Sequence, residues 1–88
     1  MIDALSFSPT GGTDRVLSVL DEVFSFSSRY SLLKPIGKAL EYDKDDVLFL
    51  FMPSYGGRAP EIAEERFRSS VIGNGARCVI VAVYGNRA

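Results

Sequence analysis

The segment Ser8-Pro9-Thr10-Gly11-Gly12-Thr13 joins a short apolar run, Ile2 to Phe7, to a segment with helical spacing of apolar residues that begins near Val16. This order predicts a strand, a tight turn and a helix. The two glycines let the backbone present its N–H groups at short range, and the helix adds the positive end of its dipole. The hydroxyl groups of Ser8, Thr10 and Thr13 can donate further hydrogen bonds. The turn is therefore expected to bind a phosphate through neutral donors.

The same segment lacks the signatures of two common nucleotide-binding motifs. It has neither the Gly-Lys-Ser/Thr ending of a triphosphate-binding P-loop nor the G-x-G-x-x-G spacing of a dinucleotide fold. A phosphomonoester is the ligand that this pattern favours. The alternative is an ordinary strand-to-helix turn whose Ser and Thr side chains cap the helix, with Thr13 as a candidate N-cap. Asp14 suits the helix dipole but adds a negative charge near a bound phosphate.

Two further loops with glycine follow apolar runs. Pro53-Ser54-Tyr55-Gly56-Gly57-Arg58 comes after the run Val47 to Met52, and Tyr84-Gly85-Asn86-Arg87 comes after the run Cys78 to Val83. In an open α/β sheet, ligands bind at the carboxyl ends of the strands. All three loops are expected at that edge of the sheet.

The remaining pattern predicts the order β-α-β-β-α-β. Strands are expected at Ile2 to Phe7, within Tyr30 to Ile36, at Val47 to Met52 and at Arg77 to Val83, and helices at about Thr13 to Phe26 and from near Pro60 to a stop before Gly73. The uninterrupted run Val47 to Met52 is typical of a strand buried on both faces of a parallel sheet. Pro35 cannot donate to a ladder, so the second strand is expected at a sheet edge. The inward face of the second helix is expected to contain Ile62, Ala63 and Phe67.

The three loops, in this order and at this spacing, resemble the flavodoxin family. The resemblance is closest to the flavodoxin-type domain that is often fused to a ferredoxin-like iron–sulfur domain, and it rests on Ser8 to Thr13, Pro53 to Pro60 and Val83 to Ala88. It implies an α/β fold with a flavodoxin-like, doubly wound parallel sheet of about four strands in the order 2-1-3-4. It also implies that residues 1–88 are the N-terminal part of an FMN-binding domain, truncated before a further helix, a fifth strand and a closing helix.

The resemblance implies FMN as cofactor and electron transfer as function. The phosphate would be held by Ser8, Thr10, Gly11, Gly12 and Thr13, the isoalloxazine ring would be framed by Ser54, Tyr55, Gly56 and Gly57, and its pyrimidine edge would meet Tyr84, Gly85 and Asn86. The protein would be a redox carrier without catalytic residues, and its partner would be a redox protein such as an iron–sulfur protein. Because the pocket would be incomplete, FMN is expected to bind weakly or to be absent from the purified protein.

Two alternatives stay open. One is a flavodoxin-like remnant that folds by self-association and binds no flavin. The other is a domain that binds a different phosphorylated ligand without redox chemistry. The strand Arg77 to Val83 is expected to be an exposed apolar edge, which predicts a homo-oligomer that pairs through this edge.

The composition narrows the classes of function. The 88 residues allow one small domain, and the hydrophobic fraction of 47% is sufficient for a globular core. A net charge of −1 with scattered cations argues against a nucleic-acid interface or a basic membrane-binding face. No apolar stretch is long enough to span a bilayer. The sequence has no histidine, so Ser-His and Cys-His catalytic pairs are excluded.

Two smaller features complete the interpretation. Cys78 is the one cysteine, lies in an apolar run and is expected to be a buried small hydrophobe. An internal disulfide is impossible, which favours a cytoplasmic location. The acidic cluster Asp43, Asp45 and Asp46 is interpreted as a solvated turn rather than a metal site, because it lacks the glycine and the following glutamate of a calcium loop.

Overall fold

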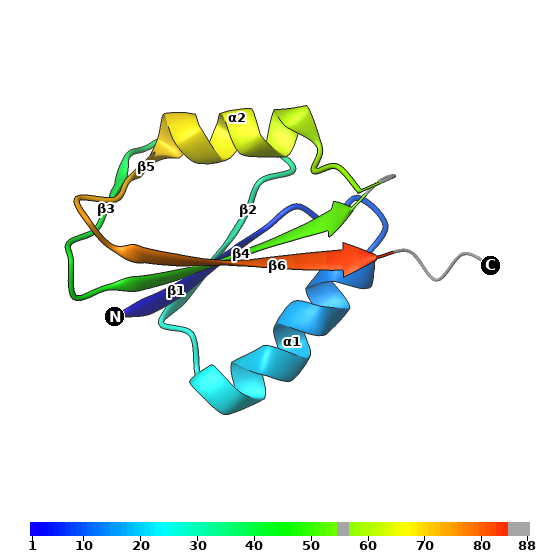
Figure 1. Cartoon of the computed structure of the whole chain (residues 1–88), viewed down its shortest axis with the longest axis horizontal. Coiled ribbons are helices and arrows are strands. Elements are labelled where there is room, and N and C mark those ends of the chain that lie inside the picture. Colours follow the sequence, from blue (N-terminus) through cyan, green and yellow to red (C-terminus); the bar gives the residue numbers. More distant parts are fainter. Residues whose placement is uncertain (55–56, 85–88) are drawn as a thin grey trace.

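The computed structural model describes residues 1–54 and 57–84. Within these residues the elements are β1 (Ile2–Ser6), α1 (Gly12–Phe24), β2 (Ser28–Ser31), β3 (Leu40–Glu41), β4 (Val47–Ser54), α2 (Glu61–Ser70), β5 (Val71–Ile72) and β6 (Arg77–Tyr84). Four strands form a parallel sheet in the order β2-β1-β4-β6, and α1 and α2 cover its opposite faces (Figure 1). The predicted α/β class with a four-stranded parallel sheet is confirmed.

β4 is buried on both faces, as its uninterrupted apolar run predicts. Its even-numbered residues, such as Leu50, belong to the core beneath α2 together with Ala63. Its odd-numbered residues, such as Phe51, pack against Leu17 of α1. Successive side chains of a strand point to opposite faces, so a central strand between two helical layers must be apolar at every position.

β4 also extends two residues further than predicted, to Ser54. The last pair that it forms with β1 is Ser6 with Phe51. Pro53 lies beyond this pair, on the side of the strand that faces β1, because the N–H of Val47 donates to Met1 and alternate residues face the same neighbour. The missing N–H of Pro53 therefore breaks no bond of the ladder.

β2 is an edge strand, as predicted, but its position differs from the prediction. It comprises Ser28–Ser31 and pairs with β1, whereas Pro35 lies after the strand and has no part in placing it at the edge. The start of β2 is determined by Asp3, whose Oδ1 accepts a hydrogen bond of 3.1 Å from the N–H of Ser28. This contact joins residues that are distant in sequence, which strand propensity does not reveal.

A second, two-stranded parallel sheet pairs β3 with β5, and no pattern in the sequence predicted it. β5 follows α2 without a loop, so the helix ends at Ser70 rather than just before Gly73. The N–H of Tyr42 donates to the carbonyl of Ile72 at 2.9 Å, and Asn74 Nδ2 donates to the carbonyl of Tyr42 at 2.8 Å. These bonds connect the segment before β4 to the segment after α2.

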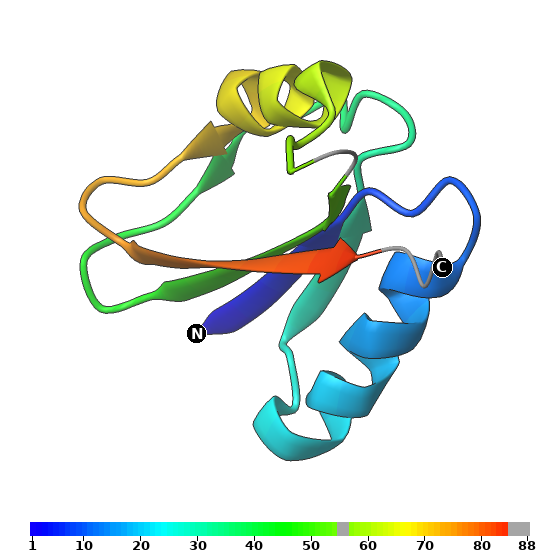
Figure 2. The same cartoon turned by 45° about the vertical axis from the view of Figure 1, so that its right-hand side comes forward.

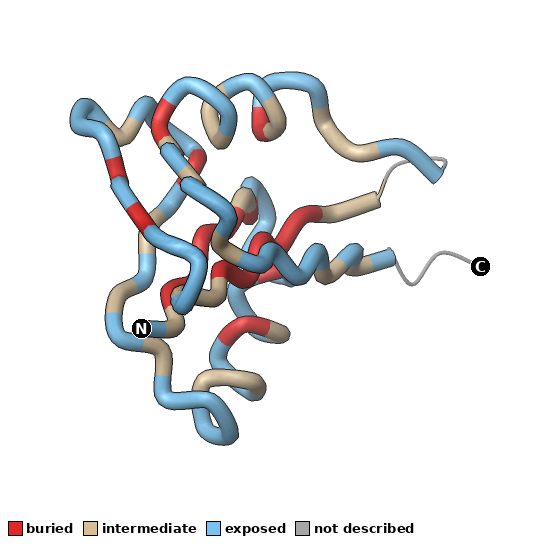
Figure 3. Tube along the Cα trace, turned by 60° about the vertical axis from the view of Figure 1, so that its left-hand side comes forward, coloured by how far each residue is buried: buried red, intermediate tan, exposed pale blue. Residues whose placement is uncertain are grey.

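Two burial predictions are wrong. Ile62 of α2 is 47% exposed, and only Ala63 and Phe67 of the predicted inward face contact the core. Cys78 is exposed rather than buried, because β6 lies at the sheet edge and α2 does not cover its end of the sheet. Figure 3 shows this difference between the buried β4 and the largely exposed β6.

The acidic cluster forms a turn, as predicted. The N–H groups of Asp43 and Asp45 donate to the carboxylates of Asp46 and Asp43, each at 2.9 Å. Within residues 1–54 and 57–84, no group of three His, Cys, Asp or Glu side chains could hold a metal ion. No helix in this described part of the chain is long and apolar enough to cross a membrane.

Candidate functional site

The candidate site lies along the carboxyl ends of the parallel strands, which together form one edge of the sheet. Ser6 at the end of β1 pairs with Phe51, and Ser54 at the end of β4 pairs with Tyr84 at the end of β6. The connection from β1 to α1 therefore leaves the same edge as the ends of β4 and β6 (Figure 2). Loops at this edge are where open α/β sheets bind their ligands.

The turn between β1 and α1 is built around a left-handed residue. Gly11 precedes the first residue of α1 and has φ of 88°, a conformation that costs little only for glycine. Thr13 does not cap the helix, contrary to the prediction, since it lies inside the first turn and is 4% exposed. The N-cap is Gly11. Ser8, three residues further upstream, contacts the helix backbone, because its Oγ accepts a hydrogen bond of 3.0 Å from the N–H of Asp14.

The remaining N–H groups at the start of α1 are available to a ligand. Helical bonding begins with the N–H of Arg15, which donates to the carbonyl of Gly11 at 3.1 Å. Among the described residues, the N–H groups of Thr10, Gly11, Gly12 and Thr13 have no protein acceptor. Thr10, Gly11 and Gly12 are exposed. Consecutive N–H groups at the positive end of a helix form a typical anion-binding arrangement.

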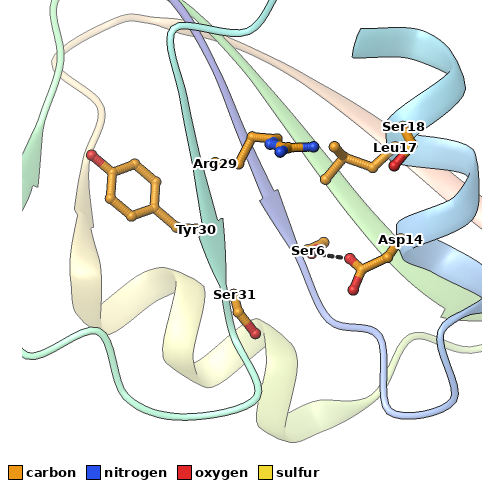
Figure 4. Close-up of a pocket in the computed structure, with 7 residues that line it drawn as sticks. All are labelled: Ser6, Asp14, Leu17, Ser18, Arg29, Tyr30 and Ser31. Carbon is orange, nitrogen blue, oxygen red and sulfur yellow. Dashed lines mark hydrogen bonds between the residues drawn. The ribbon is translucent and has the colours of Figure 1, made fainter.

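Asp14, in the first turn of α1, is hydrogen-bonded to a residue of β1. Ser6 Oγ donates a hydrogen bond of 2.8 Å to Asp14 Oδ1, and this bond holds the carboxylate toward β1 (Figure 4). No motif pointed to this pair, because Ser6 belongs to the strand and Asp14 to the helix. The only feature of the sequence that could have drawn attention to Asp14 was its negative charge, because the adjacent loop otherwise has neutral hydrogen-bond donors.

A polar cavity of about 440 Å³ lies beside this pair, between α1, β1 and β2. It is lined by Ser6, Asp14, Leu17, Ser18, Arg29, Tyr30 and Ser31, which Figure 4 shows together. Sequence reasoning missed these residues because they meet only through the pairing of β1 with β2. Arg29 lies 3.7 Å from Asp21 and is exposed.

The second and third loops are described in part. Ser54 is half-buried at the end of β4, Gly57 is exposed with φ of 82°, and Tyr84 is 70% exposed. The structure brings Ser54 and Tyr84 together as paired residues of neighbouring strands. The predicted site residues Tyr55, Gly56, Gly85 and Asn86 lie outside the described residues.

The groups with shifted pKa values lie away from this edge. Burial, followed by the hydrogen bond and charge of Asp3, raises the pKa of Tyr42 far above its ordinary value. A hydrogen bond from the backbone of Asp43 lowers the pKa of Asp46. Desolvation by neighbouring groups raises the pKa of the Cys78 thiol, although the residue is exposed. The described part of the candidate site consists mainly of backbone N–H groups and hydroxyl groups.

No protein-family model matches the sequence, and neither a curated protein nor a solved structure matches it. The fold and the site define a small α/β domain with a four-stranded parallel sheet and a glycine-containing turn at the carboxyl end of its first strand.

Proposed function

We propose that this protein is a flavodoxin-like FMN-binding domain that transfers electrons. The observation that carries the proposal is the row of N–H groups from Thr10 to Thr13 at the start of α1, which have no acceptor among residues 1–54 and 57–84. A phosphate monoester accepts several such bonds, and the helix dipole adds to their attraction. A dinucleotide or a triphosphate fits less well, because the turn has neither of their motifs.

The described residues fit the phosphate of FMN. Thr10 and Gly12 are exposed and accessible to a ligand, and Asp14 is held toward Ser6 by a hydrogen bond. Ser8 Oγ already accepts one bond from the backbone, but its own hydrogen is free to be donated. In this arrangement the backbone would bind the phosphate, and the hydroxyl groups would add specificity.

The neighbouring strand ends support a place for the flavin ring. Tyr84 is an exposed aromatic residue paired with Ser54, at the same sheet edge as the turn from Ser8 to Thr13. An aromatic side chain at this edge would stack on a flat ring and exclude water from it. Such stacking stabilises a complex by about 0.5–1.5 kcal/mol beyond the contribution of the buried area. Ser54 would donate or accept a hydrogen bond at the ring edge.

FMN, when bound, supplies reversible one- and two-electron chemistry, and the protein supplies position and environment. The sequence has no histidine, and the proposed site consists of backbone N–H groups and hydroxyl groups. The function proposed is therefore that of a carrier that exchanges electrons with a redox protein, such as an iron–sulfur protein. A cytoplasmic location is consistent with a single cysteine.

The test is a comparison of FMN with riboflavin, which lacks the phosphate. Each is titrated with the protein, and quenching of the flavin fluorescence is recorded. Saturable quenching of FMN at micromolar concentrations, with clearly weaker quenching of riboflavin, is the expected result. Equal quenching of both would contradict the phosphate assignment. If folded protein quenches neither, the domain binds no flavin and the alternative of a flavodoxin-like remnant is favoured.

A matched pair of variants tests the N–H groups themselves. A Cβ added at Gly12 meets nothing within 4 Å, so Gly12→Ala is the control for the added Cβ of Gly12→Pro. Only proline removes the N–H, and proline is well tolerated in the first turn of a helix. A hydrogen bond to a charged group contributes about 1.5–3 kcal/mol, so G12P should weaken FMN binding roughly tenfold or more relative to G12A. Riboflavin binding should change little in either variant, because riboflavin lacks the phosphate.

A further inference from the structure

β6 has one free side. It pairs with β4, and no strand among residues 1–54 and 57–84 pairs with its other side. Figure 1 shows the sheet edge-on from the side of β6, with α2 above the sheet and α1 below it. Ile80, in the middle of the strand, is 62% exposed. The strand is thus an open edge of the sheet along its whole length.

The direction of the main-chain groups of β6 follows from one hydrogen bond. The N–H of Arg77 donates to the carbonyl of Asp46 at 3.2 Å, so Arg77 faces the neighbouring strand. In a parallel ladder, alternate residues face alternate sides. Cys78, Ile80, Ala82 and Tyr84 therefore direct their N–H and C=O groups away from β4. These four donors and four acceptors form a template for another strand.

The two edges of the sheet differ in how they are protected. β2 forms the other edge with only four residues, Ser28–Ser31, and it contains the charged residue Arg29. β6 is eight residues long, and from Cys78 to Tyr84 it contains no charge and no proline. Short length and charge are the usual means of preventing edge pairing. Beyond Arg77, its first residue, β6 has neither of them.

We propose that β6 pairs with β6 of a second copy of this chain. A two-fold axis perpendicular to the sheet makes the two strands antiparallel, and the two four-stranded sheets then join into one continuous sheet. The axis passes between Val81 and Val81 of the partner subunit. This inference goes beyond the proposed function, and it holds whether or not FMN binds.

The register follows from the number of bonds and from the sizes of the side chains. With Val81 on the axis, every outward-facing residue of β6 meets an outward-facing residue of the other copy. Ile80 then lies opposite Ala82, and Cys78 lies opposite Tyr84, so each large side chain meets a small one. With Ile80 on the axis, Ile80 would meet Ile80, and Tyr84 would lie opposite Ala76, which precedes β6. The first register therefore makes more bonds and packs better.

The first experiment is sedimentation of the wild-type chain at tens of micromolar, without FMN. A dimer is expected for the wild type and a monomer for Ile80→Lys. The control is Val19→Lys, because Val19 is also 62% exposed but lies on α1. V19K should remain a dimer. A monomeric wild type, or a dimer that I80K leaves intact, would overturn the proposal.

The second experiment tests the register by disulfide formation, and it stays informative if I80K does not fold. In the background C78S, the variant V81C places two cysteines opposite each other in a non-hydrogen-bonded pair, with Cα atoms about 4.5 Å apart. V79C places them four residues apart along the strands, roughly 13 Å. Mild oxidation should cross-link V81C at least tenfold faster than V79C. Equal rates would exclude this register.

Discussion

Tyr42 donates a hydrogen bond of 2.7 Å to Asp3 Oδ2, and both residues are buried although 39 positions separate them in sequence. The other carboxylate oxygen of Asp3 accepts the N–H of Ser28. One carboxylate therefore joins β1, the start of β2 and the residue that follows β3. A buried carboxylate with a hydrogen bond to each oxygen is costly to disturb, because a lost partner leaves a desolvated acceptor.

Removal of the Tyr42 hydroxyl should destabilise the fold. Tyr42→Phe keeps the ring in the core but leaves Asp3 Oδ2 without its donor. The expected loss in the free energy of unfolding is about 1–3 kcal/mol. Tyr30→Phe is the control, since Tyr30 is half-buried and the same atom is removed. Urea denaturation followed by circular dichroism measures both. An equal small effect of the two variants would show that the Tyr42 bond contributes little.

The same pair predicts a loss of stability at alkaline pH. Burial and Asp3 raise the pKa of Tyr42 in the folded state, whereas in the unfolded chain the hydroxyl ionises near its ordinary value of about 10. The stabilising contribution is therefore complete below about pH 10 and decreases as the pH rises above it. The difference in unfolding free energy between wild type and Y42F should stay constant up to about pH 10 and shrink as the pH rises above it. A constant difference would contradict the pKa shift.

Asp46 predicts the opposite dependence, at acid pH. The backbone N–H of Asp43 lowers its pKa, and the N-terminal amino group lies 3.2 Å from the same carboxylate. A lowered pKa contributes stability above the unfolded value, and this contribution is lost as the pH falls through the folded value. Asp46→Asn should thus lower the melting temperature at neutral pH and have little effect in strong acid. Asp45→Asn, in the same turn, serves as the control.

Gly11 and Gly12 should respond differently to alanine. A side chain at either position meets nothing within 4 Å, but only Gly11 has a positive φ, 88°. Gly11→Ala should cost about 1 kcal/mol of stability, because an L-residue is strained in the left-handed region. Gly12→Ala should leave stability unchanged or raise it slightly, since it restricts the unfolded chain. Thermal unfolding of the two variants separates backbone strain from steric crowding. Equal losses of stability would show that the positive φ of Gly11 is not the cause.

Cys78 should be reactive in the native protein, contrary to the burial that its sequence suggests. It is exposed, and because desolvation raises its pKa, its rate of labelling by a thiol reagent should increase at a higher pH than that of an ordinary thiol. If β6 pairs with β6, Tyr84 of the partner subunit covers Cys78, so labelling should slow as protein concentration rises. The I80K variant should lose this dependence on concentration. Complete protection of Cys78 at all concentrations would contradict its exposure.

Local patterns were sufficient to predict the main elements. The apolar run from Val47 to Met52 predicted a strand buried on both faces, and the glycine pair after Ser8 predicted a turn between a strand and a helix. These features depend on hydrophobic periodicity and on backbone freedom, which are properties of neighbouring residues. The same reasoning predicted which end of the sheet carries the candidate site, because that end follows from the parallel direction of the strands.

The errors concern contacts and exposure that residue type and local spacing do not reveal. Thr13 has the residue type of an N-cap, but the hydroxyl that reaches the helix backbone belongs to Ser8. Ile62 and Cys78 belong to apolar patterns, yet the position of α2 and the edge position of β6 expose them.

The amino-acid sequence alone therefore determined the presence of the four strands of the main sheet, the two helices and the polar turn before α1, but not β3 and β5. Only the tertiary structure decided that Asp3 meets Tyr42, that Ser6 holds Asp14 and that β6 is left with a free edge. The physical reason is that propensity and periodicity act over a few residues. Burial and the partners of polar groups depend instead on which distant segments the fold places side by side.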